Sequence, residues 1–489
     1  MAPTLLPGIV AEHRLLGNDL GGHEDWTRCM ASIHHGCWFY VTDHPVAMES
    51  GEKSAVTPIN RMDEPVCPVS VEEATLADPE ILECPYPTYS LLREQAPVWQ
   101  DPRTGIYVIT RYEDLKRACL DTERFSNLRP SNDHAKLTGN ARKAYELFLE
   151  KGWVPAPSLA ARDDPEHKQM RSIFDNAFRP KRINELDDEV RDLAYRLVSE
   201  FIDDGHCNFV KQLAVPLPLI IICRQMGAKE EDIWQIKAWT DAWFRGTGFG
   251  LREEDVLWCT EMEIQAQHYF QKIFERLREQ PDGTLLSDLV NTEVPGWGRT
   301  LNDNELHAEM MQDTFVGGSE TTTNALSAGI MLLARNPRVW ERLKSDPDKY
   351  LKTFCEEVVR LESPVQGLTR TALVDIELHG VTIPKGATID VRFAAGNRDP
   401  ERFERPDEID LDRRNAAGHL GFSSGTHYCL GAPLARRELY WGFKAFIDSV
   451  EDFWLAPEKN DLRHYPNYAL RALNELHIEF TPRSERASP

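Results

Sequence analysis

A loop that contains a single cysteine is the strongest chemical signal in the sequence. Residues 422–431 follow the pattern Phe-x-x-Gly-x-His-x-Cys-x-Gly, in which the cysteine is Cys429. A helical pattern begins directly afterwards at Ala432, with Pro433 in its first turn, where a missing N–H does no harm. Cys429 is therefore predicted to lie at a helix N-terminus, where the dipole and free backbone N–H groups favour thiolate over thiol. Such a thiolate can ligate haem iron and push electron density onto it, which favours O–O cleavage.

Two glycines of this loop, Gly425 and Gly431, are expected to allow a tight backbone that directs N–H groups at the sulfur. The alternative is a buried cysteine in a glycine-rich turn, which is the usual state of a free cysteine. The complete pattern around Cys429 favours the iron ligand.

A second signal lies in the middle of a long helix predicted over Asn302 to Leu333. Residues 317–321 read Gly-Gly-Ser-Glu-Thr and place Glu320 beside Thr321. Two adjacent glycines cost a helix roughly 2 kcal/mol relative to alanine, which indicates close backbone approach or a kink. Helix packing through small residues is the alternative, and the motif alone does not decide between them.

Four basic side chains stand close to the other motifs or share a helix face. His167 and Arg171 are four residues apart, so a helix places both on one face. Arg370 precedes a predicted strand at Ile376, and His427 lies two residues before the cysteine. Each of these, taken alone, also fits an ordinary surface residue.

In this order along the chain, the motifs resemble those of the cytochrome P450 family in its soluble bacterial form. The resemblance covers roughly Asp78 to Thr481 and includes Asn-Arg-Asp-Pro at 397–400. It implies a mainly α fold with small β-sheets. It also implies that haem b lies between the long distal helix Asn302–Leu333 and the helix after Cys429, with Cys429 as the axial iron ligand.

The resemblance gives roles to the remaining motif residues. His167, Arg171, Arg370 and His427 match positions that bind the haem propionates, which are buried anions and need several cations. Three further residues match a buried scaffold cluster with no catalytic role, namely Glu357, Arg360 and Arg413.

The implied reaction is the oxidation of an apolar small molecule by dioxygen. One oxygen atom enters the substrate and the other leaves as water, with electrons supplied by NAD(P)H through a ferredoxin and its reductase. Glu320 and Thr321 are the implied catalytic pair. We expect Thr321 to face the haem pocket and Glu320 to turn toward a water path, because adjacent helical residues project in different directions. A peroxide-driven peroxygenase and a non-catalytic haem-binding module are the alternatives.

The regions implied to contact substrate are rich in aromatic and aliphatic residues, which suits a hydrophobic molecule. A terpenoid, a steroid, a fatty compound or an aromatic compound fits equally well. The residues expected in these regions are Trp153, Leu217, Ile220, Trp239, Trp243, Phe244, Phe249, Phe315, Leu368 and Tyr468.

Composition limits the other possibilities. The 489 residues carry a net charge of −23, which disfavours nucleic acid and anionic membranes as partners. The ten cysteines include no C-x-x-C pair, so a cytoplasmic protein without a disulfide framework is expected. No membrane span is expected, because no segment reaches about 18 consecutive apolar residues. The protein is also expected to be a monomer. The resemblance implies that the ferredoxin docks on the cysteine side of the haem, where the candidate cations are Lys168, Arg171, Arg179, Arg436 and Arg437.

Periodicity predicts the elements that must position these residues. Residues 1–70 lack a sustained pattern and are interpreted as an extension of unknown role, whereas residues 71–489 form the haem-thiolate domain. Turn residues between 98–100 and 107–109 predict a hairpin, and a second strand pair is predicted between 376–378 and 388–391. Other expected elements are helices over 85–94, 186–202, 254–279, 346–361 and 432–450, and a strand over 476–480.

Overall fold

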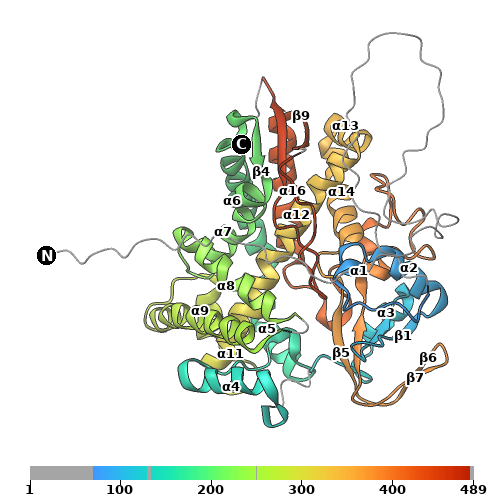
Figure 1. Ribbon diagram of the computed structural model, residues 1–489. Helices are drawn as coiled ribbons and strands as arrows, with labels where there is room; N and C mark the ends of the chain where they lie inside the picture. The colour runs from blue at the N-terminus through green and yellow to red at the C-terminus, as the bar shows by residue number, and fades with distance from the viewer. Residues whose placement is uncertain (1–69, 129–133, 249–250, 457, 485–489) are drawn as a thin grey trace. The chain divides into compact units, whose positions relative to one another are not determined.

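The computed structural model describes residues 70–128, 134–248, 251–456 and 458–484 (Figure 1). Residues 1–69, which make up nearly all of the predicted extension, lie outside the described part of the chain. Helices dominate the described residues, and small sheets accompany them.

Four helices form the framework that supports the cysteine loop: α6 (Pro180–Ser199), α12 (Thr321–Arg335), α14 (Pro347–Glu362) and α16 (Ala432–Ser449). Glycines let α12 and α16 approach closely. A Cβ on Gly442 would lie 2.8 Å from Leu326 Cδ2, and one on Gly329 would lie 2.3 Å from Phe443 Cζ. Both contacts are shorter than real Cβ atoms tolerate, so a larger residue at either position would force Leu326 or Phe443 to move.

The predicted long helix is present, but its middle is not an α-helix. It consists of α11 (Asp303–Ala308), the π-helical segment η7 (Glu309–Glu320) and α12. Asn302 caps its start, because its side chain accepts from the Glu305 N–H at 3.0 Å while Glu305 accepts from the Asn302 N–H at 2.9 Å. The π-helical segment contains both glycines of the motif, and such segments are frequent at functional sites.

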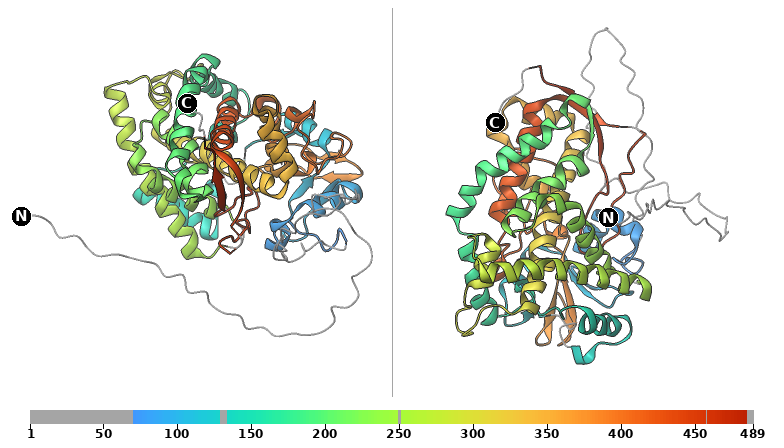
Figure 2. Two further views of the ribbon diagram at one scale, coloured as in Figure 1. Left: turned by 90° about the horizontal axis from the view of Figure 1, so that it is seen from above. Right: turned by 90° about the vertical axis from the view of Figure 1, so that its left-hand side faces the viewer.

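A group of helices lies on one side of this long helix, and the largest sheet lies on the other side (Figures 1 and 2). The helical side contains α4 (Gly139–Lys151), α8 (Ile233–Gly246) and α9 (Glu253–Glu279). Phe270 of α9 stacks on Phe315 of η7 with ring centroids 4.9 Å apart. The helical side is therefore packed directly on the residues just before Glu320.

The largest sheet has the strand order β1-β2-β8-β5-β3. The predicted hairpin is confirmed, since β1 (Val98–Gln100) pairs with β2 (Tyr107–Ile109) in antiparallel fashion. β8 (Thr388–Val391) lies parallel to β2 and antiparallel to β5 (Leu368–Ala372), while β3 (Phe125–Ser126) forms the edge.

The predicted pairing of 376–378 with 388–391 is wrong. β6 (Ile376–Leu378) pairs with β7 (Val381–Ile383), and β8 joins the larger sheet. His379 and Gly380 adopt φ values of 50° and 77°, so they form a two-residue turn that closes the hairpin earlier than expected. The Pro384-Lys385-Gly386 turn then leads from β7 into β8.

The predicted strand near the C-terminus is confirmed as β10 (His477–Pro482), which lies between β4 (His206–Asn208) and β9 (Val450–Leu455). The remaining α-helices are α1 (Pro79–Glu83), α2 (Tyr86–Gln95), α3 (Tyr112–Leu120), α5 (Glu166–Ala177), α7 (Pro216–Gln225), α10 (Leu285–Asn291), α13 (Pro337–Ser345) and α15 (Phe393–Gly396).

Candidate active site

The cysteine loop has the local structure that the sequence predicts, except at one glycine. The Cys429 N–H donates to the Phe422 carbonyl at 2.9 Å, and α16 begins three residues after Cys429. Gly425 has φ 72°, and a Cβ there would lie 2.7 Å from the Cys119 carbonyl oxygen, so glycine is required. Gly431 has an ordinary helical φ of −77°, and its expected conformational role is not borne out.

Cys429 retains exposed surface, but the protein around its thiol still removes much of the water that would solvate a thiolate. Burial raises the pKa of its thiol, while the backbone N–H groups of Gly431 and Ala432 and the charge of Arg171 act in the opposite direction. The backbone alone therefore does not hold the sulfur as a thiolate. A bound iron would complete the ionisation, because a coordinating thiol is deprotonated.

The structure brings the four expected propionate-binding residues together. His167 and Arg171 lie one turn apart on α5, and Arg370 is buried on β5. The rings of His167 and His427 have centroids 4.0 Å apart. Burial and the charges of His167, Arg370 and Arg171 lower the pKa of His427 to about 3. Arg171 and Arg370 are the two cations of this group, and the neutral histidine rings can donate hydrogen bonds, so the four residues together suit a bound anion.

One buried atom in this cluster tests whether haem fits. His167 Nε2 is buried and has no hydrogen-bond partner among the described residues, whereas its Nδ1 lies 3.4 Å from Asp164 Oδ1. Arg171 also binds the protein, since its Nη1 donates to the Thr426 carbonyl at 3.3 Å. A buried donor without a partner costs free energy, and a propionate oxygen would satisfy it. The residues present therefore fit haem propionates around His167 and thiolate ligation by Cys429.

The side chain of Glu320 is buried and forms an ion pair, whereas the sequence predicted that it turns toward a water path. Its Oε1 accepts a hydrogen bond from Thr240 Oγ1 at 2.8 Å and lies 3.3 Å from Lys237 Nζ, both on α8. Burial raises the pKa of Glu320, and Lys237 partly offsets this increase. Lys237 also pairs with Asp241, whose side chain is exposed. The structure thus links Glu320 to the surface through charged side chains.

Thr321 follows Glu320 on the next helical position and is half-buried. Its Oγ1 donates to the Gly317 carbonyl at 2.8 Å. Gly317 is exposed, and a Cβ there would meet only the Gln312 carbonyl oxygen at 3.8 Å. A Cβ on Gly318 would make ordinary contact with Ile222 at 3.7 Å. Helix packing therefore does not require glycine at either position.

The predicted scaffold cluster is confirmed by the geometry. Glu357 and Arg360 are fully buried on α14, and Arg360 Nε lies 2.6 Å from Glu357 Oε1. Arg413 Nε approaches the same oxygen at 3.0 Å. Arg360 also donates to the carbonyls of Asn397 and Glu408, each at 3.0 Å. The cluster joins α14 to the segment that precedes the cysteine loop.

The expected substrate-contacting residues differ in how far they are exposed. Leu217, Ile220 and Phe315 belong to the buried core, and Tyr468 is covered by Arg392, whose guanidinium lies 4.2 Å from its ring centroid. By contrast, Leu368 is exposed on β5. Trp239 is also buried, Trp153, Trp243 and Phe244 are half-buried, and Phe249 lies outside the described residues.

Sequence reasoning missed Lys237 and Thr240, although both lie within a region expected to contact substrate. Their i,i+3 spacing places them on one face of α8. The available signal was a lysine in a helix that consists largely of apolar residues.

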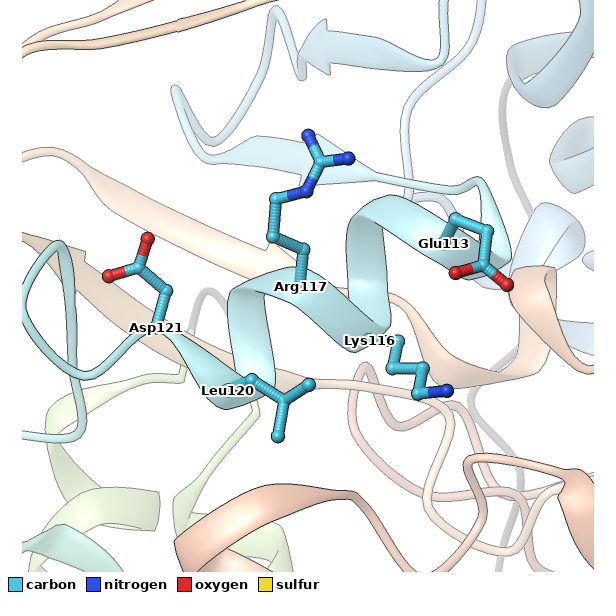
Figure 3. Close-up of a pocket in the computed structure, with 5 residues that line it drawn as sticks. All are labelled: Glu113, Lys116, Arg117, Leu120 and Asp121. Atoms are coloured by element: carbon cyan, nitrogen blue, oxygen red, sulfur yellow. The ribbon is translucent and has the colours of Figure 1, made fainter.

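A surface hollow of about 320 Å³ lies on α3, and neither Glu320 nor Thr321 lines it (Figure 3). Its lining residues are Glu113, Lys116, Arg117, Leu120 and Asp121. A single helical segment lines it, so it is not a site for an enclosed substrate.

Comparisons with known proteins agree with this geometry. The family model for cytochrome P450 matches residues 257–462. The chain is 30% identical over 457 residues to the steroid C26-monooxygenase of Rhodococcus jostii (strain RHA1), covering 90% of each protein. It is 30% identical over 425 residues to the cytochrome P450 monooxygenase PikC of Streptomyces venezuelae, covering 84% of this chain and 96% of PikC. The structure of CYP109E1 from Bacillus megaterium in complex with testosterone matches with a TM-score of 0.72 at 28% identity, covering 82% of this chain and 99% of that one.

The chain belongs to the cytochrome P450 family and has the P450 fold, in which the haem lies between the long distal helix and the cysteine-ligand helix. It is a cytochrome P450 monooxygenase, and its cofactor is haem b. No helix within the described ranges is long and apolar enough to cross a membrane.

Proposed function

We propose that the protein oxidises a hydrophobic small molecule with dioxygen, and that Cys429 is the axial ligand of its haem iron. The observation that carries this proposal is the thiol of Cys429 just before α16, with the cluster of His167, Arg171, Arg370 and His427 nearby. Haem supplies the iron chemistry that activates dioxygen. The two arginines would pair with the propionates and the two histidines would donate hydrogen bonds to them, which would fix the orientation of the cofactor.

The substrate is proposed to be a lipid, a steroid or a polyketide. Relatives of the chain are named steroid C26-monooxygenase, methyl-branched lipid omega-hydroxylase and polyketide biosynthesis cytochrome P450. Aromatic residues of α8 and α9 and the exposed Leu368 support an apolar substrate.

Glu320 and Thr321 are proposed to deliver protons to the distal side of the haem. Glu320 exchanges protons through Lys237 and the exposed Asp241. The Thr321 hydroxyl is anchored to the Gly317 carbonyl, so its oxygen is positioned to accept a hydrogen bond from water. A peroxide-driven enzyme has no need of this relay, and the intact pair therefore favours reaction with dioxygen.

Electrons are proposed to come from NAD(P)H through a ferredoxin that docks beside the cysteine loop. Lys168 and Arg179 are exposed and form no ion pair with a described residue. Arg171, Arg436 and Arg437 do pair internally, with Asp175, Glu356 and Asp187 respectively.

The surface of α3 extends this docking face. Leu120 is exposed, and its Cδ2 would lie 3.2 Å from a Cβ on Gly425 of the cysteine loop. Lys116 and Arg117 precede it on the same helix (Figure 3). Glu113 and Asp121 line the same surface, so Lys116 and Arg117 are the part of it that suits a small acidic iron–sulfur protein.

The proposal is tested by Cys429→Ala. Purified protein is expected to carry one haem b and to show the red-shifted Soret band of a thiolate-ligated carbon monoxide complex, and the variant is expected to lack that band. Cys119→Ala is the control, because Cys119 is buried beside the loop and contacts Ser423. Retention of the thiolate band in Cys429→Ala would disprove the ligand assignment.

A further inference from the structure

All three guanidinium nitrogens of Arg436 on α16 donate to groups within the protein. Its Nε donates to Oε1 of Glu356 at 2.6 Å, and its Nη2 donates to Oε2 of the same carboxylate at 3.1 Å. Its Nη1 donates to the Tyr428 hydroxyl at 3.0 Å. The Arg436 side chain is 32% exposed, yet its charge-assisted hydrogen bonds are directed to intramolecular partners.

The same guanidinium contacts the cysteine loop on both sides of the ligand. It lies over the ring of Phe422, 4.5 Å from the ring centroid, and Tyr428 directly precedes Cys429 in the chain. The Phe422 carbonyl in turn accepts the Cys429 N–H at 2.9 Å. Arg436 therefore touches the residue that accepts the backbone hydrogen bond of Cys429 and also the residue next to it.

A further contact fixes the orientation of Glu356 on α14. The Gly421 N–H donates to Nδ1 of His419 at 3.0 Å, so the proton of the neutral ring is on Nε2, which lies 3.1 Å from Oε2 of Glu356. Burial alone would raise the pKa of Glu356, but its bonds with His419 and Arg436 lower that pKa to about 2. Glu356 is therefore a carboxylate at neutral pH, and it joins Arg436 to the segment that leads into the cysteine loop.

The backbone of the loop needs contacts of this kind. Ser423 directly follows Phe422 and has φ 60°, a left-handed conformation that costs a non-glycine residue free energy and persists where the surrounding structure holds it. Gly425 has φ 72°. Both conformations lie between Phe422 and Tyr428, which are the two points at which Arg436 holds the loop.

We propose that Arg436 is a positioning residue for the haem ligand, which holds the cysteine loop in its iron-binding conformation and raises the reduction potential of the bound iron with its positive charge. The inference rests on the proposed function, because it takes Cys429 as the axial ligand. It assigns Arg436 to the loop itself, in place of the ferredoxin contact expected from the sequence.

The sign of the charge makes this role testable. Groups around a metal ligand fix its orientation and tune the metal. Reduction of ferric haem adds one electron, and a nearby positive charge favours the state that carries this electron. The carboxylate of Glu356 acts in the opposite direction. Removal of Arg436 and removal of Glu356 should therefore shift the potential in opposite directions, whereas general disruption of the loop would shift it in the same direction in both variants.

The experiment measures the reduction of ferric to ferrous haem in purified, haem-loaded protein, with mediator dyes that pass one electron to the iron and without ferredoxin. Arg436→Gln is expected to lower the equilibrium constant for reduction by roughly threefold or more, and Glu356→Gln is expected to raise it by a similar factor. The double variant is expected to lie within about twofold of wild type. Arg436→Lys keeps the charge but loses the two-bond contact with Glu356, so its constant should stay near that of wild type while its melting temperature falls.

Arg437→Gln is the matched control, because Arg437 is the next residue on α16, loses the same charge and pairs with Asp187 of α6, with 3.3 Å between Nη1 and Oδ1. Its constant for reduction is expected to match that of wild type. Haem content and the thiolate band are measured in every variant. If Arg436→Gln loads no haem, the sign of the Glu356→Gln shift and the constant of Arg436→Lys decide the question.

Shifts of the same sign in Arg436→Gln and Glu356→Gln, or wild-type constants in both, would overturn the inference. An Arg436→Gln variant with the wild-type constant but a raised KM for ferredoxin would return Arg436 to the docking face. Failure of the proposed function would show separately, as absence of the thiolate band from the carbon monoxide complex of wild type or as its retention in Cys429→Ala.

Discussion

The Nζ of Lys237 on α8 lies 3.3 Å from Oε1 of Glu320 on the π-helical segment η7. Both side chains are largely removed from solvent, and Asp241 continues the pair to the surface. Through this ion pair, α8 partly offsets the rise that burial causes in the pKa of Glu320.

Replacing Lys237 with Met is expected to slow turnover by roughly tenfold without loss of haem. The neutral side chain removes the cation that offsets burial, so the pKa of Glu320 rises further and its carboxylate form becomes scarcer. The measurement is the steady-state rate with its solvent isotope effect, which should increase. Lys229→Met is the control, because Lys229 is exposed and pairs only with Glu231. Equal rates in the two variants would show that the Lys237 pair has no part in proton delivery.

Thr321→Ala is expected to keep haem, substrate binding and NAD(P)H consumption but to divert electrons to hydrogen peroxide. The variant loses the hydroxyl that donates to the Gly317 carbonyl and is proposed to anchor water, while the rest of the helix is unchanged. The measurement is product formed per NAD(P)H consumed, and Glu320→Gln should slow turnover more than it lowers this ratio. Ser327→Ala removes a similar hydroxyl bond, to the Thr323 carbonyl, and serves as the control. An unchanged ratio in Thr321→Ala would leave Thr321 as a packing residue.

Glu357→Ala is expected to give poorly folded protein without haem. It leaves the buried guanidinium groups of Arg360 and Arg413 without their carboxylate. Breaking such a pair typically costs about 3–5 kcal/mol, a large share of the roughly 5–15 kcal/mol that stabilises a domain. Haem content and thermal unfolding are measured, with Glu408→Ala as the control because that side chain forms an exposed pair with Arg405. A variant with full haem occupancy and normal melting would contradict the structural role.

Glu438 on α16 is expected to make stability depend on pH. Burial raises the pKa of Glu438 from 4.5 to about 8, although a hydrogen bond with Thr322 opposes this. Because the folded state binds the proton more tightly, the contribution of this group is fully present below about pH 4.5 and is lost as the pH rises toward about 8. Glu438→Gln stays neutral, so urea midpoints should show it gaining stability over wild type between pH 5 and pH 8.5. Parallel pH curves for the two proteins would refute this assignment.

Residues 1–65, which precede the described core, are expected to be dispensable for haem binding. The described core begins at Ala74 and Leu76, both fully buried, and every residue proposed to bind haem lies downstream. We propose that residues 71–489 form the haem domain, so deletion of residues 1–65 should leave haem content and the thiolate band intact. Deletion through residue 78 removes both core residues and should lower the melting temperature. Loss of haem in the shorter deletion would show that the first 65 residues belong to the haem domain.

The sequence by itself determined the local features of the site. The pattern around Cys429 predicted a loop that enters a helix, because glycine, proline and helical periodicity act over a few residues. The same holds for the spacing of His167 and Arg171 and for the length of the helix that carries Glu320. Where local signals were ambiguous, the prediction was wrong, as in the pairing of 376–378, which the turn at His379 and Gly380 redirected to β7.

Only the tertiary structure decided which distant side chains meet. Lys237 reaches Glu320 because α8 packs across η7, and Arg413 reaches Glu357 because the segment before the cysteine loop folds back onto α14. Charges and donors interact over a few ångströms in space and not along the chain, so the fold had to bring these groups together before their chemistry was defined.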